Sequence, residues 1–288
     1  MSQSSTPLND LWQARFGFEP ETALLKDDAL ANLPAGKAIE LLLQHRTHRV
    51  FEDKPISDEV LNTLLGCTLS APSKSDLQQG SIVIVDEPGL RGQIAELIPA
   101  MPWISSAPVF MIFLADGHRI ERICKSRGKP FANDNLDNFL AAISDASLML
   151  QNTIIAAEAL GLGCCPISVI RDHMATVAEL LHLPSRVVPL AGLCLGYPAR
   201  EGFVSMRLPP AVTVHRNHYD VDQVDEGVND YDRRRDARFS LPADRQKYKK
   251  DFGMAAFYGW SEDKARQMAK EERATVGQFA REHGFTLR

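Results

Sequence analysis

The sequence predicts a globular fold that mixes buried β-strands with helices, and three observations carry that prediction. The chain has 288 residues, 44% of them hydrophobic and 24% charged, which is typical of a globular protein with a sizeable core. Four short runs are almost continuously apolar, as strands covered on both faces are. The longest helical pattern, residues 135–160, is apolar nearly all round after Ala146, which predicts a buried central helix that also suits a subunit interface.

The predicted elements alternate along the chain. The apolar runs predict strands at 81–85, 107–114 and 187–196, and a strand or extended turn at 164–170. Helical spacing appears between them, and Ser57 is a good N-cap because acidic Asp58 and Glu59 follow it in the first turn. Residues 1–35 form a polar arm with some helical content, and residues 220–288 are rich in charge of both signs. Within the long helix the polar members are expected to be satisfied interior groups and not catalysts; they are Asp145, Gln151 and Asn152.

Composition excludes several classes of protein. The net charge of −5 argues against a general nucleic-acid binder, which carries a basic excess. No apolar run reaches the ~18 residues of a membrane span, and the first ten residues lack the features of a secretory signal, so we expect a cytoplasmic protein. The five cysteines and eight histidines show no metal-ligand spacing. Cys164 and Cys165 are interpreted as reduced, buried thiols. A redox dithiol is disfavoured because neighbouring strand residues point to opposite faces.

One stretch concentrates hydrogen-bond donors, and it runs from His45 to Phe51 with Arg46 and Arg49 inside it. The stretch follows a helical pattern and precedes a turn, and a donor cluster at such a helix end suits a phosphate. Arginine in particular binds phosphate through paired hydrogen bonds. A solvated basic corner explains the same residues, and the stretch alone does not decide between the two. The charged connection 117–134 is likewise either an anion-binding patch or a mobile solvated loop over an active site.

Four common enzyme motifs are absent from the sequence. No GxGxxG follows a predicted strand, and there is no Walker motif, HExxH or GxSxG. The residues available for chemistry are hydrogen-bond donors and cations, without a paired acid and base. We therefore expect no catalytic side chain, and a protein that holds a phosphorylated cofactor which does the chemistry.

The order and spacing of several motifs resemble the flavin-dependent nitroreductase family, with its NADPH-preferring nitroreductase and flavin reductase branch the nearest in pattern. The likeness covers residues 37–215 and extends loosely into the tail. The matching segments are 45–51, 55–57, 70–73, 77–78, 151–152, 156–163, 183–184, 188–190, 192–198 and 207–209.

The resemblance implies an α+β, three-layer fold. A central, mostly antiparallel sheet would be flanked by helices, with a long buried central helix and an entwined homodimer that holds FMN at the subunit interface. It also implies an N-terminal arm at 1–35, an FMN-binding domain at 36–215, and a helical C-terminal extension at 216–288 that packs on the same domain.

Site residues follow from the resemblance by position. The donor stretch would contact the phosphate, ribityl chain and pyrimidine edge of FMN, and a polar loop would contribute from the other subunit. A third segment would run along the isoalloxazine ring with a backbone amide near N5, and an arginine would lie near the phosphate. In that order the residues are His45, Arg46, Thr47 and Arg49; Ser73 and Ser75; Pro166, Ile167, Ser168 and Val169; and Arg207 with Ser205.

Three positions depart from the family pattern. Ser205 replaces the usual lysine, Asp76 replaces a common loop asparagine, and Ser168 and Val169 replace small glycines near the ring. The missing lysine removes a cation from the phosphate site, and the larger side chains narrow the space above the flavin. These changes bear on cofactor affinity and substrate range more than on the type of reaction.

The implied activity is FMN-dependent NAD(P)H oxidation coupled to reduction of nitroaromatics, quinones or flavins. Hydride would pass through flavin N5 in ping-pong order. Arg233 and Arg235, with Arg234 between them, either bind the 2′-phosphate of NADPH or form a solvated face. The alternatives are a specialised relative that carries out reductive dehalogenation or flavin destruction, and a non-redox protein that binds a phosphorylated ligand. Expected partners are a small-molecule acceptor and a second copy of the chain, with no nucleic acid, membrane or metal.

Overall fold

The computed structural model describes residues 8–20, 24–25, 29, 31–33 and 35–288, and these form two compact units. The sheet unit comprises residues 46–203 with 273–288. The helical unit comprises the described residues up to His45 together with 204–272. The three hydrophobic core clusters lie in the sheet unit, and the two units are described separately. Parts of the N-terminal arm expected at 1–35, namely residues 1–7, 21–23, 26–28, 30 and 34, lie outside the described residues.

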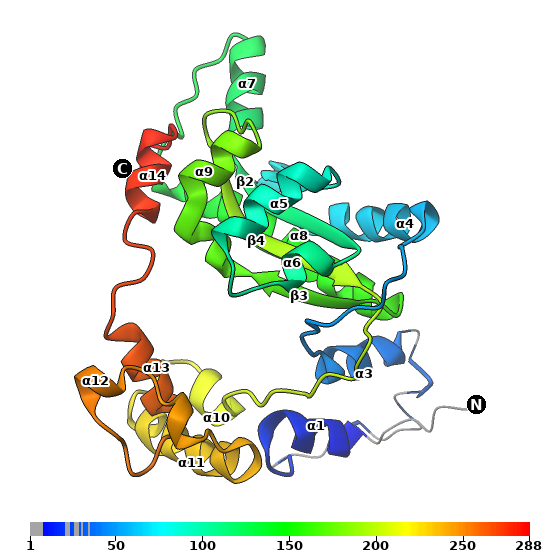
Figure 1. Ribbon diagram of the computed structural model, residues 1–288. Coiled ribbons are helices and arrows are strands. Elements are labelled where there is room, and N and C mark those ends of the chain that lie inside the picture. Colours follow the sequence, from blue (N-terminus) through cyan, green and yellow to red (C-terminus); the bar gives the residue numbers. More distant parts are fainter. Residues whose placement is uncertain (1–7, 21–23, 26–28, 30, 34) are drawn as a thin grey trace. The chain divides into compact units, whose positions relative to one another are not determined.

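The sheet unit is built on four antiparallel strands in the spatial order β1-β2-β4-β3 (Figure 1). The predicted strands are confirmed, although β3 ends earlier than expected because residues 168–173 turn into a 3₁₀ helix. The strands are β1 (Gly80–Ile84), β2 (Val109–Asp116), β3 (Gly163–Ile167) and β4 (Val187–Gly196).

Helices cover both faces of this sheet and complete a three-layer α+β fold. Alternating residues of β2 show the arrangement, because Phe110 and Ile112 join one core cluster while Met111 and Phe113 join the other. One face is covered by α4 (Asp58–Leu69) and α8 (Leu136–Ala159). The other carries α5 (Pro88–Leu97), α6 (Trp103–Ser106) and α9 (Met174–Leu180), which lie in front of the strands in Figure 1.

The capping group predicted from the sequence, Ser57, sets the start of α4. The Ser57 hydroxyl accepts a hydrogen bond from the backbone amide of Val60 at 3.5 Å. In α8 the Asn135 side chain accepts from the backbone amide of Asn138 at 3.1 Å. Both contacts satisfy donors that the first turn of a helix leaves free.

Helix α8 is buried on one side only within this chain. Ala142 and Ala157 have no exposed surface, whereas Leu140 and Leu148 are 52% and 39% exposed. Burial on all sides is therefore not achieved by the single chain. By length and hydropathy α8 also meets the criterion for a membrane span, contrary to the sequence expectation. This is weak evidence, since core helices pass the same test.

The charged connection at 117–134 is not a continuous loop. Helix α7 (His118–Ser126) occupies its first half and stands at the top of Figure 1, with no residue buried. Its apolar residues Ile120, Ile123 and Cys124 share one face at helical spacing, and the high charge density of the segment obscured that pattern. The chain returns to this end of the sheet through α14 (Val276–Glu282), where Phe285 is 2% exposed.

The helical unit joins segments that are far apart in the sequence. Arg15, 5% exposed, donates hydrogen bonds to the backbone carbonyls of Leu43 at 2.8 Å, His45 at 2.7 Å and Ser205 at 2.7 Å. Satisfying a buried guanidinium in this way ties the arm to the residues after 203. The helices of this unit are α1 (Leu8–Phe16), α3 (Gly36–Gln44), α10 (Pro210–Thr213), α11 (Asp222–Phe239), α12 (Lys249–Phe252) and α13 (Trp260–Met268).

Candidate functional site

Arg46 presents a half-buried guanidinium that already holds an anionic oxygen. Its Nη1 lies 2.8 Å from the carboxylate of Glu201 and donates to the carbonyl of Gly202 at 3.1 Å. The Arg46 side chain is 21% exposed, whereas that of Glu201 is 86% exposed. Nη1 therefore contacts both a backbone carbonyl, which helps to orient the guanidinium, and a solvent-facing carboxylate, whose oxygen is the kind of partner that a phosphate would supply.

The donor stretch lies against the outer strand β3. The backbone amide of His48 donates to the carbonyl of Cys164 at 2.9 Å, and the ring of His48 packs directly on Gly163. Arg49 lies 5.6 Å from the centroid of the Trp103 ring and beside the thiol of Cys165. The structure thus brings the donor stretch next to the strand that leads into residues 166–169.

Residues 166–169 alternate between exposed and core-facing positions. Pro166 and Ser168 are exposed, whereas Ile167 is 1% exposed and belongs to the core cluster. Val169 is half-buried against the same cluster. The Ile167 side chain therefore faces away from the surface that a ring would cover, and only the backbone of this residue is available to a ligand.

The loop that carries Ser73 and Ser75 is attached to helix α8 through Asp145. This carboxylate, 2% exposed, accepts hydrogen bonds from the Ser73 hydroxyl at 2.7 Å and from the backbone amides of Lys74 and Gln79 at 2.8 Å each. The expectation that Asp145 is a satisfied interior group is confirmed.

The other two polar residues of α8 that carried this expectation differ from it or meet it only in part. Gln151 is exposed in this chain, and half-buried Asn152 donates to the carbonyl of Cys67 at 3.1 Å.

A cavity of about 650 Å³ opens beside this loop. Ser73, Asp76 and Gln78 line it together with Arg119 and Asp145. Arg119 donates to the hydroxyl of Ser81 and to the carboxylate of Asp116 at 2.9 Å, so its charge is partly neutralised within the sheet unit. The cavity has the size of a small-molecule site.

The two candidate regions lie at diagonally opposite corners of the sheet. The Ser73 loop leads into Gly80, which is level with Ala115 at the far end of β2 on the β1 edge. His48 binds β3 beside Gly163, which pairs with Gly196 at the other end of the sheet. The two outer strands are three strand spacings apart, about 14 Å. One chain therefore does not bring Arg46 and Ser73 into a single pocket.

Three of the predicted cofactor residues belong to the helical unit. The carbonyls of His45 and Ser205 share the guanidinium of Arg15, and Arg207 donates from Nη1 to the Ser205 hydroxyl at 2.6 Å. The Ser205 hydroxyl thus binds the neighbouring arginine at the position where a lysine was expected. Arg15 was not singled out from the sequence, because an isolated arginine in a polar arm carries no local signal.

The three arginines of α11 differ in their contacts. Arg233 pairs with Asp230, and Arg235 donates to the hydroxyl of Tyr231 at 3.0 Å. Arg234 stacks on Phe18, with its guanidinium 5.0 Å from the ring centroid. Arg233 is the most exposed, with 66% of its side chain accessible, so it is the member of the set best placed for a soluble anion.

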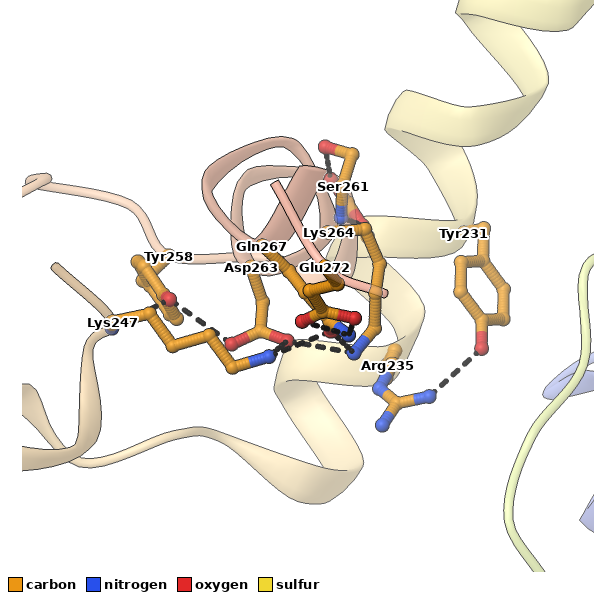
Figure 2. Close-up of polar contacts among 10 residues, drawn as sticks. Tyr231, Arg235, Lys247, Tyr258, Ser261, Asp263, Lys264, Gln267 and Glu272 are labelled. Carbon is orange, nitrogen blue, oxygen red and sulfur yellow. Dashed lines mark hydrogen bonds and ion pairs between the residues drawn. The ribbon is translucent and has the colours of Figure 1, made fainter. Parts of the chain in front are cut away.

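A separate polar cluster fixes the lysines near α13 (Figure 2). The amino groups of Lys247 and Lys264 lie 3.0 and 2.9 Å from Asp263, and the hydroxyl of Tyr258 donates to the same carboxylate at 3.0 Å. Burial raises the pKa of Asp263, but the hydrogen bonds from Lys264, Lys247 and Tyr258 lower it by more than burial raises it. The net pKa of Asp263 is therefore below the usual value. These lysines are engaged with Asp263.

The cysteines are free thiols, and three of them are buried. Cys164 and Cys165 belong to different core clusters, so the prediction that they face opposite sides of the strand is confirmed. Burial raises the pKa of both thiols and of Cys194, and for Cys165 the Arg49 guanidinium opposes that rise. Within the described ranges no group of three or more metal-ligating side chains is placed to hold an ion.

Solved structures of other proteins have the same fold as this chain. The NADPH:FMN oxidoreductase from Vibrio harveyi, in complex with NAD⁺, superimposes with a TM-score of 0.76 at 31% identity, over 87% of this chain and 99% of that one. A second structure, of B. megaterium NfrA2, gives a TM-score of 0.76 at 32% identity, over 88% of this chain and 99% of that one.

Residues 42–197 match the nitroreductase family, and residues 205–288 match its C-terminal domain. The chain belongs to the nitroreductase family. It is 38% identical over 181 residues to the oxygen-insensitive NADPH nitroreductase of Salmonella typhimurium, which covers 63% of this chain and 74% of that protein. It is 34% identical over 199 residues to the FMN reductase (NADPH) of Bacillus subtilis, covering 68% and 80%.

Proposed function

We propose that this oxidoreductase passes electrons from NAD(P)H, in ping-pong order, to a small electron-poor acceptor such as a nitroaromatic compound, a quinone or a free flavin. The NAD(P)H-dependent activity and the use of FMN agree with the family and with the activities named for its relatives. FMN, when bound, supplies the two-electron chemistry. The non-redox alternative of a simple phosphorylated-ligand binder does not agree with these relatives.

The donor corner carries the proposal. Arg46 already binds a carboxylate oxygen and is anchored to the Gly202 carbonyl, so its guanidinium is oriented before a phosphate arrives. Arg49 lies beside β3, where its charge suits an electron-rich ring edge. Pro166 and Ser168 leave the adjoining surface exposed, which gives a ring and a flat acceptor room to stack. No side-chain proton donor is required of this chain.

The separation of the two candidate regions supports a homodimer. A two-fold axis would bring the Ser73 loop of one chain to the Arg46 corner of the other and build two equivalent sites. The apolar exposed face of α8, with Leu140 and Leu148, supplies surface for such an interface. We propose that each FMN is held by both subunits, in a cytoplasmic enzyme.

The test is cofactor binding followed by acceptor turnover. Purified protein should be yellow and should bleach with NADPH in the absence of oxygen. Arg46→Ala should lose FMN while its far-ultraviolet circular dichroism is unchanged. Unchanged FMN occupancy in this variant would contradict the phosphate assignment. A steady-state screen of acceptors with NADPH and NADH then separates a general reductase from a specialised dehalogenating or flavin-degrading relative, which would turn over none of the general acceptors.

A further inference from the structure

The loop between α4 and β1 holds three non-glycine residues in the left-handed region of backbone space. Ser75, Asp76 and Gln78 have φ angles of 51°, 56° and 52°. Such angles are uncommon for residues with a Cβ, and three within four positions are not expected from local preference. The segment from Ser70 to Gln79 contains no glycine to relieve this cost, so contacts from outside the loop must hold its shape.

Asp145 supplies those contacts from helix α8. Its carboxylate binds the Ser73 hydroxyl and the Lys74 amide on one side of the left-handed residues, and the Gln79 amide on the other. Asp145 is 2% exposed, and both of its carboxylate oxygens accept hydrogen bonds from the loop. One buried carboxylate thus joins the two ends of loop 73–79.

A second line of hydrogen bonds anchors the end of the loop. The Gln79 side chain, fully buried, accepts from Asn138 Nδ2 at 2.8 Å. Asn138 in turn accepts from Arg186 Nη2 at 3.1 Å, and Arg186 donates to the carbonyl of Gly284 at 2.8 Å. The loop is therefore tied to the C-terminal segment of the sheet unit through buried polar groups, which are costly to break individually.

The two serines of the loop have different capacities to bind a ligand. The Ser73 hydroxyl donates its proton to Asp145 and accepts from the Gln78 amide at 2.7 Å, so its donor is used inside the loop. Ser75 is exposed, and its hydroxyl makes no hydrogen bond within the part of the chain that the structure describes. Of these two serines, therefore, Ser75 is the one with a hydroxyl proton available to a ligand.

We propose that Asp145 and Ser73 are positioning residues that hold loop 73–79 in its left-handed shape, so that the Ser75 hydroxyl, already expected from the family pattern to contact FMN, is left available to it. That the ligand is FMN rests on the proposed function. The clamp itself is a property of the chain without cofactor.

The experiment uses cofactor-free protein and three variants, Asp145→Asn, Ser73→Ala and Ser75→Ala. FMN affinity is measured by flavin fluorescence, and loop opening by hydrogen exchange of peptides that span residues 70–80. Asp145→Asn and Ser73→Ala should raise the FMN Kd about tenfold and speed exchange of the loop, because a buried amide or carboxylate loses its partner. Ser75→Ala should raise the Kd about fivefold, the loss of one hydrogen bond, with exchange unchanged.

Thr153→Val is the matched control. Thr153 lies on the same helix, is fully buried, and makes a 2.7 Å hydrogen bond to Thr68 away from the loop. This variant should lower the Tm while leaving FMN affinity and loop exchange unchanged.

Two results would overturn the assignment: wild-type FMN affinity in Asp145→Asn, or unchanged affinity in Ser75→Ala together with a loss in Ser73→Ala. If the wild-type protein itself fails to bind FMN, the proposed function fails. Loop exchange in cofactor-free Asp145→Asn still decides whether the clamp exists.

Discussion

Replacing Glu201 with glutamine should strengthen FMN binding. In the structure the Glu201 carboxylate lies 2.8 Å from Arg46 Nη1, where a phosphate oxygen would compete for the same guanidinium. The carboxylate is largely exposed, and such an ion pair contributes about 0.2–1 kcal/mol, so removing its charge should lower the FMN Kd by about 1.4- to 5-fold. Arg46 keeps its orientation, because its bond to the Gly202 carbonyl does not involve the substituted side chain.

The assay is a flavin fluorescence titration of cofactor-free protein at low and high salt. Screening weakens the competition, so the advantage of Glu201→Gln should shrink as ionic strength rises. Glu52→Gln is the control, because Glu52 is an exposed carboxylate of the same unit and changes the net charge equally. Weaker FMN binding in Glu201→Gln would refute the reasoning, since Glu201 would then support the cofactor and not compete with it.

Three further outcomes follow from the structure. Asp263→Asn should reduce the free energy of unfolding at neutral pH. The difference from wild type should narrow as pH falls below about 4, because a carboxylate with a lowered pKa stops stabilising the fold once it is protonated. Urea unfolding from pH 3 to 7 measures this difference. Iodoacetamide should alkylate exposed Cys67 in the native protein, while the three buried thiols react only after unfolding, as peptide mass spectrometry would show. Gly163→Ala should cost about 1–3 kcal/mol in urea unfolding, since a Cβ there would lie 2.7 Å from Cγ of His48.

The layers of the sheet unit were predictable because their signal is local. Buried strands can be recognised in a sequence as apolar runs, and β4 was predicted with its observed bounds, Val187–Gly196. Ser57 likewise marked the start of α4 through cap chemistry. Helix α7 was missed because its three apolar residues are outnumbered by charged ones, so composition favoured a loop.

The candidate site was less predictable because its key contacts span long distances in the chain. Nothing near Ser73 indicates that its hydroxyl is already bound to Asp145, which lies 72 positions away. The partners of Arg15 in the helical unit are between 28 and 190 positions away. Residue type identified the donors, but only folding determines which of them remain available to a ligand.

The placement of the Arg46 corner and the Ser73 loop at opposite ends of the sheet couples two equilibria. In the proposed dimer an isolated subunit holds only part of each coenzyme contact, so association and coenzyme uptake must reinforce each other by the same factor. Flavin should shift dissociation of the subunits to lower protein concentration, and dilution should release flavin. The supply of FMN would then help to set how much of this protein exists as an assembled pair.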